Sequence, residues 1–353
     1  MDGRQFRSLS NVAVMRHLAS TRLTLVGMAL LAIGSGLSYG NPEHMSVWVL
    51  VVPMAVLAVN LTAAIISNSR INRRAGLLVF HISLLLIVVL AAIGRLTHVD
   101  ARVEVVVGNE YSGKNVYNIK AGPFFENRLE EIEFFQGPFT VSYMPWLTRG
   151  PTNAQITYEK DGELVEQIIG DDRPLIIDGY RFYTSYNKGF APLLTWYPDD
   201  GAEPMNGTVH MPSYPLYEYR QDSSWTPPGS EEIKFWLQLS TAYDEGNDWV
   251  LEPETSHGVL VVNVDGERVE LLLGDEIQLA GGRLQYRDLT MWMGYKVFYD
   301  PTIHWLFYVS VIGVLGLSFH FWKRFANLPI NDEKASTVEN KSGLASRNYR
   351  VDH

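Results

Sequence analysis

The sequence predicts a membrane protein with four transmembrane α-helices, three N-terminal and one C-terminal, plus a large all-β extracytoplasmic domain. Apolar residues gather in four blocks, three before residue 96 and one after residue 302. Basic residues gather at those ends of the blocks that would share one side of the membrane, and the long segment between the third and fourth blocks is polar with period-two alternation. Together these features favour a soluble domain held outside the membrane by helices.

The four apolar blocks predict spans at residues 23–37 (extended by a few residues), 47–66, 76–94 and 303–322. Each approaches the roughly 20 residues needed to cross a hydrocarbon core of about 30 Å. The first block follows a long polar lead and precedes no Ala-x-Ala site, so we expect a retained anchor rather than a cleaved signal peptide.

The basic residues predict that both termini are cytoplasmic. They precede the first span, fill the loop between the second and third spans, and follow the fourth: Arg4, Arg7, Arg16, Arg22; Arg70, Arg73, Arg74; Lys323, Arg324. The expected organisation is a cytoplasmic N-terminus (1–22), a three-helix membrane region (23–95), an extracytoplasmic β-rich domain (96–302), a fourth transmembrane helix (303–322) and a disordered cytoplasmic tail (323–353).

Paired turn signals organise the predicted β domain. Asp161-Gly162 and Asp265-Gly266 each separate two β-type runs, and such pairs favour the type I′ turns of hairpins. Each hairpin is followed by a glycine, a short strand, a turn and an aromatic strand at nearly equal spacing. An internal duplication and an ordinary β-meander or sandwich with similar punctuation both account for this order. Residues 202–230, rich in Pro, Tyr and Ser, predict an ordered loop or linker.

Composition excludes several kinds of chemistry. The chain has no cysteine, so it has no thiolate nucleophile, thiolate metal ligand or disulfide of its own. From Leu96 to Thr302 there are 33 acidic and 15 basic residues, a balance that does not suit nucleic acid or anionic lipid. Walker A, His-Glu-x-x-His, Gly-x-Ser-x-Gly and Rossmann patterns are missing, and no catalytic residue can be named.

His81 is the one ionisable residue of the third span. Its neighbours at helical spacing are leucines, so no side chain on its own helix offers a hydrogen bond. An intramembrane imidazole needs a partner or a ligand. One interpretation is an interhelical hydrogen bond, for instance to Asn60; the other is axial ligation of haem or another metal.

Three further histidines, His44, His98 and His304, fall near the predicted outer surface. They form a candidate secondary external site, although interfacial histidines are often merely solvated. Apart from haem iron, the sequence predicts no metal site.

The chain resembles the ResB (CcsB) family of the System II cytochrome c biogenesis pathway. The resemblance runs from about residue 20 to residue 324. It rests on TRLTLVGMALLAIGSGLSYG in the first span, RRAGLLVFHISLLLIVVLAAIG with His81 in the third, RPLIIDGYRFYTSYNKG, and MGYKVFYDP before the last span. The domain is shorter than in many members, and no tryptophan-rich loop of the partner type is present.

The resemblance implies a haem-handling subunit of the bacterial cytoplasmic membrane, with its large domain in the periplasm. Its partners would be a multi-span tryptophan-rich protein of the ResC (CcsA) type, apocytochrome c, the lipid bilayer and haem b as transient cargo. It also implies that His81 is an axial haem ligand, and that the chain is a non-catalytic or co-catalytic subunit of a holocytochrome c synthase (haem lyase).

Two other functions compete with haem handling. A membrane-anchored scaffold or sensor would bind an extracytoplasmic protein through its β domain, without haem transfer, and would tolerate loss of His81. A small-molecule permease is disfavoured because one buried ionisable group gives little material for a polar pathway.

Overall fold

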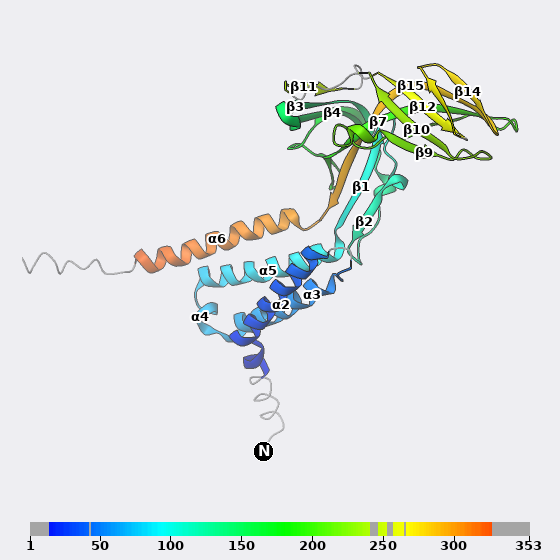
Figure 1. Cartoon of the computed structure of the whole chain (residues 1–353). Coiled ribbons are helices and arrows are strands. Elements are labelled where there is room, and N and C mark those ends of the chain that lie inside the picture. The colour runs from blue at the N-terminus through cyan, green and yellow to red at the C-terminus, as the bar shows by residue number, and fades with distance from the viewer. Residues whose placement is uncertain (1–13, 42–43, 241–245, 253–256, 265, 327–353) are drawn as a thin grey trace, which may run out of the picture. The chain divides into compact units, whose positions relative to one another are not determined.

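The computed structural model of the chain describes residues 14–41, 44–240, 246–252, 257–264 and 266–326 (Figure 1). The chain divides into two compact units. We call them the helical unit, Met1–Ile93 with Thr302–His353, and the β unit, Gly94–Pro301.

Four helices of the described chain are long and apolar enough to cross a membrane, which confirms the prediction of three N-terminal spans and one C-terminal span. A short helix, α4, joins α3 to α5. The bounds are α2 Thr21–Gly40, α3 Trp48–Ser67, α4 Ser69–Asn72, α5 Ala75–Thr97 and α6 Ile303–Ala326.

Glycines allow two pairs of these helices to pack closely. A Cβ atom on Gly34 of α2 would lie 2.8 Å from the carbonyl oxygen of Val49 in α3. A Cβ on Gly76 of α5 would lie 2.7 Å from the carbonyl oxygen of Gly316 in α6. Small residues at such crossings let backbones approach within lipid, where the hydrophobic effect does not drive helices together. The contacts α2–α3 and α5–α6 therefore depend on residues without side chains.

The β unit contains a central seven-stranded sheet and two four-stranded sheets in its described part, all with antiparallel pairing. The central sheet has the order β2-β1-β15-β7-β6, with β14 added to β15 and β8 added to β7; the others have the orders β13-β12-β10-β9 and β11-β3-β4-β5.

The strand bounds follow the chain: β1 Val99–Val106, β2 Tyr117–Ala121, β3 Phe135–Met144, β4 Thr148–Lys160, β5 Glu163–Ile169, β6 Leu175–Ile177, β7 Tyr180–Pro198, β8 Met205–Thr208, β9 Asp222–Trp225, β10 Ile233–Leu239, β11 Trp249–Leu251, β12 Gly258–Val264, β13 Glu267–Leu271, β14 Glu276–Leu279 and β15 Gly282–Tyr299. Short 3₁₀ helices lie at Gly113–Asn115, Leu129–Glu131, Pro145–Leu147 and Glu218–Arg220.

The turn between β4 and β5 has the predicted conformation. Asp161 and Gly162 both have positive φ, 54° and 83°, as a type I′ turn requires. In the second predicted turn Gly266 has φ 84°, whereas Asp265 lies outside the described residues.

The two halves of the β unit repeat the same strand order with the same register. Lys160 pairs with Glu163 across the first Asp-Gly turn, as Val264 pairs with Glu267 across the second. Leu175 pairs with Phe182 in β6–β7, as Ile277 pairs with Leu284 in β14–β15. In each half, one hairpin joins an outer sheet and the next joins the central sheet, where β7 and β15 pair with each other. The structure thus favours the duplication over an ordinary meander.

One segment contains strands that its composition does not indicate. Residues 202–230, predicted as an ordered loop or linker, contain β8, which pairs with β7, and β9, which pairs with β10. Residues 209–211 also bond to β7, through Val209 N to Pro192 O and Met211 N to Phe190 O. This segment therefore carries side chains onto the central sheet.

Candidate functional site

His81 lies half-buried on α5, and a hydrogen bond fixes one edge of its ring. Its Nδ1 lies 2.7 Å from the carbonyl oxygen of Leu77, one turn earlier in the same helix. A carbonyl oxygen only accepts, so Nδ1 carries the proton, and in the neutral ring Nε2 keeps its lone pair. Among the described residues nothing bonds to Nε2. This arrangement, with Nδ1–H on a backbone carbonyl, is the common one for metal-ligating histidines.

Asn60 is not the partner of His81. Its side chain is 4% exposed and connects α3 to the start of α2. Its Nδ2 donates to the carbonyl oxygens of Leu18 and Ser20, the latter at 3.1 Å, and its Oδ1 accepts from Thr24 Oγ1 at 2.7 Å. Asn60 thus acts as a polar link between two apolar helices. The imidazole of His81 finds its bond in its own helix backbone, an option that side-chain spacing does not reveal.

The three histidines of the predicted external site belong to different units. His44 is exposed between α2 and α3, and His304 is exposed at the start of α6, both in the helical unit. His98 follows α5 in the β unit, with its Nδ1 3.0 Å from the carbonyl oxygen of Arg95. A shared site for the three remains a prediction.

A further histidine of the β unit, His210, was not singled out from the sequence and has a carboxylate partner. His210 Nδ1 lies 2.7 Å from Glu104 Oε2, and Tyr117 Oη donates to Glu104 Oε1 at 2.8 Å. The ring of His210 stacks on Trp292, with centroids 5.5 Å apart and planes at 6°. The hydrogen bonds from His210 and Tyr117 outweigh burial and lower the pKa of Glu104, although burial alone would raise it.

No local pattern in the sequence predicts the cluster of His210, Glu104 and Tyr117. Glu104 and His210 are 106 positions apart, and they meet because β1 and residues 209–211 flank the β15–β7 pair of the central sheet. A histidine in a Pro-rich segment predicted as a linker gave no reason to expect a carboxylate partner.

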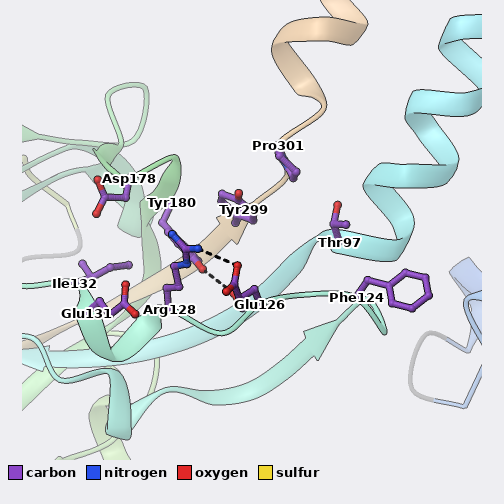
Figure 2. Close-up of a pocket in the computed structure, with 10 residues that line it drawn as sticks. All are labelled: Thr97, Phe124, Glu126, Arg128, Glu131, Ile132, Asp178, Tyr180, Tyr299 and Pro301. Carbon is purple, nitrogen blue, oxygen red and sulfur yellow. Dashed lines mark hydrogen bonds and ion pairs between the residues drawn. The ribbon is translucent and has the colours of Figure 1, made fainter.

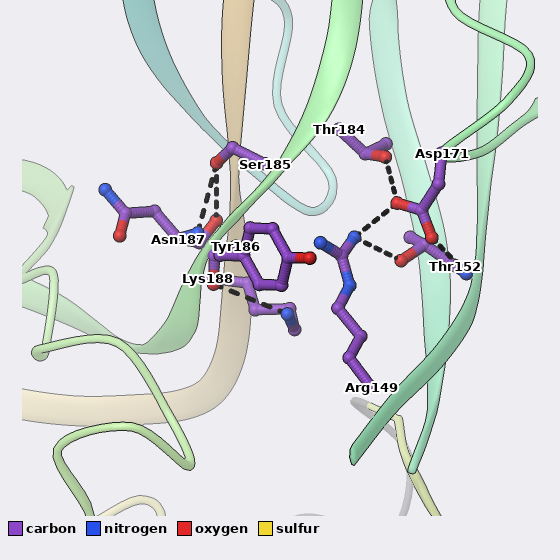
Figure 3. A network of polar contacts seen from close by, with 8 residues as sticks. All are labelled: Arg149, Thr152, Asp171, Thr184, Ser185, Tyr186, Asn187 and Lys188. Carbon is purple, nitrogen blue, oxygen red and sulfur yellow. Dashed lines mark hydrogen bonds and ion pairs between the residues drawn. The ribbon is translucent and has the colours of Figure 1, made fainter. Parts of the chain in front are cut away.

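A second polar cluster lies around residues 184–188 of β7 (Figure 3). Arg149 Nη2 bonds to Asp171 Oδ1 and, at 2.6 Å, to Thr152 Oγ1. The Asp171 carboxylate also accepts from Thr184 Oγ1 at 2.9 Å, and the ring of exposed Tyr186 lies 4.5 Å from the guanidinium. Figure 3 shows Arg149 between this ring and the carboxylate.

Lys188 lies in the same cluster but outside its ion pair. It is 1% exposed, and its Nζ has the carbonyl oxygen of Tyr186 at 3.4 Å and the ring centroid of Tyr143 at 5.6 Å. Burial, and secondarily the charge of Arg149, lowers the pKa of this amine from 10.5 to about 7. The side chain is therefore a buried base that is largely neutral above pH 7.

A pocket of about 480 Å³ lies within the β unit (Figure 2). Tyr180 and Tyr299 stack at its wall with centroids 4.6 Å apart. Three carboxylates and one guanidinium line it: Glu126, Glu131, Asp178 and Arg128. Arg128 is already paired with Glu126 at 2.9 Å. An acidic wall beside an aromatic pair favours a cationic ligand over an anionic one.

Comparison with known proteins gives a family match and distant structural likenesses. The family model of the ResB-like family matches residues 64–213, which are 150 of the 353 residues. No curated protein matches the chain in sequence.

Among solved structures, a chain described as cytochrome c heme lyase CcmF is similar at 12% identity, with a TM-score of 0.28. The comparison covers 90% of this chain and 40% of that one. A TM-score this low supports no inference about this chain. The family match, however, includes His81 and the strands up to β8, and over residues 64–213 it confirms the resemblance to the ResB-like family drawn from the sequence.

Proposed function

We propose that this chain is a subunit of a System II cytochrome c synthase complex. It holds or moves haem b in the membrane and helps to present it to apocytochrome c for covalent attachment. It acts in the bacterial cytoplasmic membrane beside a ResC (CcsA)-type partner, with both termini cytoplasmic and the β unit outside. The family match supports the coarser part of the proposal, a role in cytochrome c biogenesis.

The observation that carries the haem part is the hydrogen bond of His81. With Nδ1 held by Leu77 O, the lone pair of Nε2 points away from the helix backbone and is the donor that haem iron takes from a neutral imidazole. The surroundings are apolar helix residues, which suit a porphyrin. Because the bond to Leu77 O already orients the ring, the His81 side chain loses little rotational freedom when haem binds.

The acidic pocket of the β unit has a different role in this proposal. Haem propionates are anions, and the acidic pocket disfavours them. The stacked tyrosines and carboxylates instead suit a positively charged peptide segment, so we assign this pocket to the protein substrate or partner rather than to haem.

The test is the visible absorption spectrum of the complex, co-purified in detergent with its multi-span partner. Wild type, His81→Ala and His320→Ala are compared, since His320 is another half-buried histidine of a membrane helix. We expect haem bands in the wild type and in His320→Ala, weaker bands in His81→Ala, and recovery of those bands with added imidazole.

Equal bands in all three preparations would remove His81 from haem binding and leave the partner as the haem site. Absence of haem in all three would favour a scaffold whose β unit binds a protein without haem transfer.

A further inference from the structure

In the cluster of His210, Glu104 and Tyr117, Nε2 of His210 has no hydrogen-bond partner among the described residues, so its electron pair is open to a ligand. Glu104 uses both carboxylate oxygens, one for His210 and one for Tyr117. An ionised carboxylate only accepts, so Nδ1 of His210 carries the proton, and Nε2 of the neutral ring keeps its lone pair. The two ring nitrogens point in nearly opposite directions, which turns Nε2 away from Glu104.

The ring is held in place on a second side as well. Trp292 stacks on its face, and Trp292 is in turn fixed by a bond from its Nε1 to Met211 O at 3.0 Å. Trp292 itself is 3% exposed, whereas the side chain of His210 is 32% exposed. A rigid, buried platform thus carries a partly accessible imidazole with a defined tautomer.

The nature of the ligand follows from this single donor. A bare transition-metal ion takes several protein ligands, whereas iron already held by four porphyrin nitrogens needs only an axial one. Carboxylate-bound histidines are stronger donors than free ones, because the carboxylate raises ligand basicity and fixes the ring.

We propose that His210 is a second axial haem ligand of this chain, located on the β unit, with Glu104 as its positioning residue. This inference rests on the proposed haem-handling function. His210 would bind the haem iron through Nε2, at a step separate from His81. The Nδ1 of His210 is bonded to a carboxylate, whereas the Nδ1 of His81 is bonded to a backbone carbonyl.

The experiment is titration of the full chain, purified in detergent, with ferric protoporphyrin IX, in the His81→Ala background. This background removes the membrane ligand. His210→Ala is added to it, and His257→Ala serves as matched control because His257 is an exposed histidine of the same unit. We expect His81→Ala to bind haem with a histidine-ligated spectrum, the pair with His210→Ala to bind at least about tenfold more weakly, and the pair with His257→Ala to be unchanged.

Glu104→Gln tests the positioning role without removing the ligand. The amide keeps the size of the side chain but not its charge, so we expect roughly tenfold weaker haem binding and a higher reduction potential of the bound haem. A purely structural role of Glu104 would leave that potential unchanged.

Two results would overturn the inference: the same spectrum and affinity with and without His210→Ala, or no haem binding by His81→Ala at all. Neither result contradicts haem ligation by His81. That role fails separately, if wild type and His81→Ala bind haem alike while His210→Ala still weakens binding.

Discussion

His81 and His210 show how the hydrogen-bond acceptor at Nδ1 differs between membrane and water. In α5 the acceptor is the neutral carbonyl of Leu77, which is available without burying a charge in lipid. In the β unit it is the ionised Glu104, which is 24% exposed and further supported by Tyr117. An anionic acceptor stabilises positive charge on the ring and iron more than a carbonyl does. If both histidines hold haem, His210 should favour ferric iron more than His81.

Lys188 yields a prediction about stability at the residue scale. Lys188→Met should raise the free energy of unfolding by about 1–4 kcal/mol at pH 7, because it replaces a buried amine without a counter-charge. The pKa falls from 10.5 to about 7 on folding, so the unfolded chain takes up the proton first as pH falls. The wild type therefore loses stability from pH 10.5 down to about 7, and the deficit is constant below that.

Denaturant unfolding of the full chain in detergent, followed by tryptophan fluorescence, measures this effect. The gain from Lys188→Met should be greatest at and below pH 7 and shrink as pH approaches 10.5. Lys234→Met is the control, since Lys234 is exposed on β10 and should show no such dependence. A pH-independent difference between Lys188→Met and wild type would show that the buried charge is not the cause.

At the scale of elements, the α5–α6 contact depends on backbone approach. Gly76→Ala places a methyl group 2.7 Å from Gly316 O and 2.9 Å from His320 N, and backbone atoms cannot move aside as a flexible side chain does. We expect a loss of about 1–3 kcal/mol and a lower melting temperature in detergent.

Gly36→Ala in α2 is the matched change, because a Cβ there meets nothing within 4 Å. It should leave the melting temperature unchanged or raise it slightly, since alanine favours helix over glycine. A similar loss in both variants would mean that the effect of Gly76→Ala does not come from the α5–α6 contact.

The long strands β7 and β15 explain why period-two reasoning works in only part of the β unit. In the first half of β7 and at the start of β15, burial alternates, as expected for a strand with one solvated face, but from Met291 to Tyr295 every position of β15 is buried. From Lys188 to Trp196, however, β7 is buried at nearly every position. Val106, Ala191 and Trp292 form a small cluster of their own there, separate from the main core. Other segments cover both faces of the strand there. This is a tertiary effect, so the alternation of residues along one strand does not predict it.

For the whole molecule, absence of cysteine permits a direct test of orientation. Leu164→Cys lies on β5 at 79% exposure, and Arg73→Cys lies in the exposed loop between α4 and α5. In intact cells, a membrane-impermeant maleimide should label Leu164→Cys and spare Arg73→Cys. After lysis both should react, and the cysteine-free wild type should not react in either case. Labelling of Arg73→Cys in intact cells would reverse the orientation proposed from the basic residues.

The sequence predicted features that depend on neighbouring residues, and missed those that depend on distant ones. Apolar blocks, the Asp161-Gly162 turn and the equal spacing of the two β halves are local, and the structure agrees with each. His81 was found because one polar residue in an apolar run is conspicuous. His210 was missed because its partner is 106 residues away, and the bond from His81 to Leu77 O was missed because backbone acceptors leave no trace in side-chain patterns.

The first and last strands of the β unit pair with each other, from Val99 opposite Tyr299 to Val106 opposite Trp292. The closure entropy of a loop depends on its freely moving residues, and hydrogen-bonded strands contribute none. As a tether between α5 and α6, the β unit therefore behaves like a connection of a few residues, Thr97 to Val99 and Tyr299 to Ile303, although about two hundred residues lie between. Insertions elsewhere in the β unit can lengthen the chain without lengthening this tether.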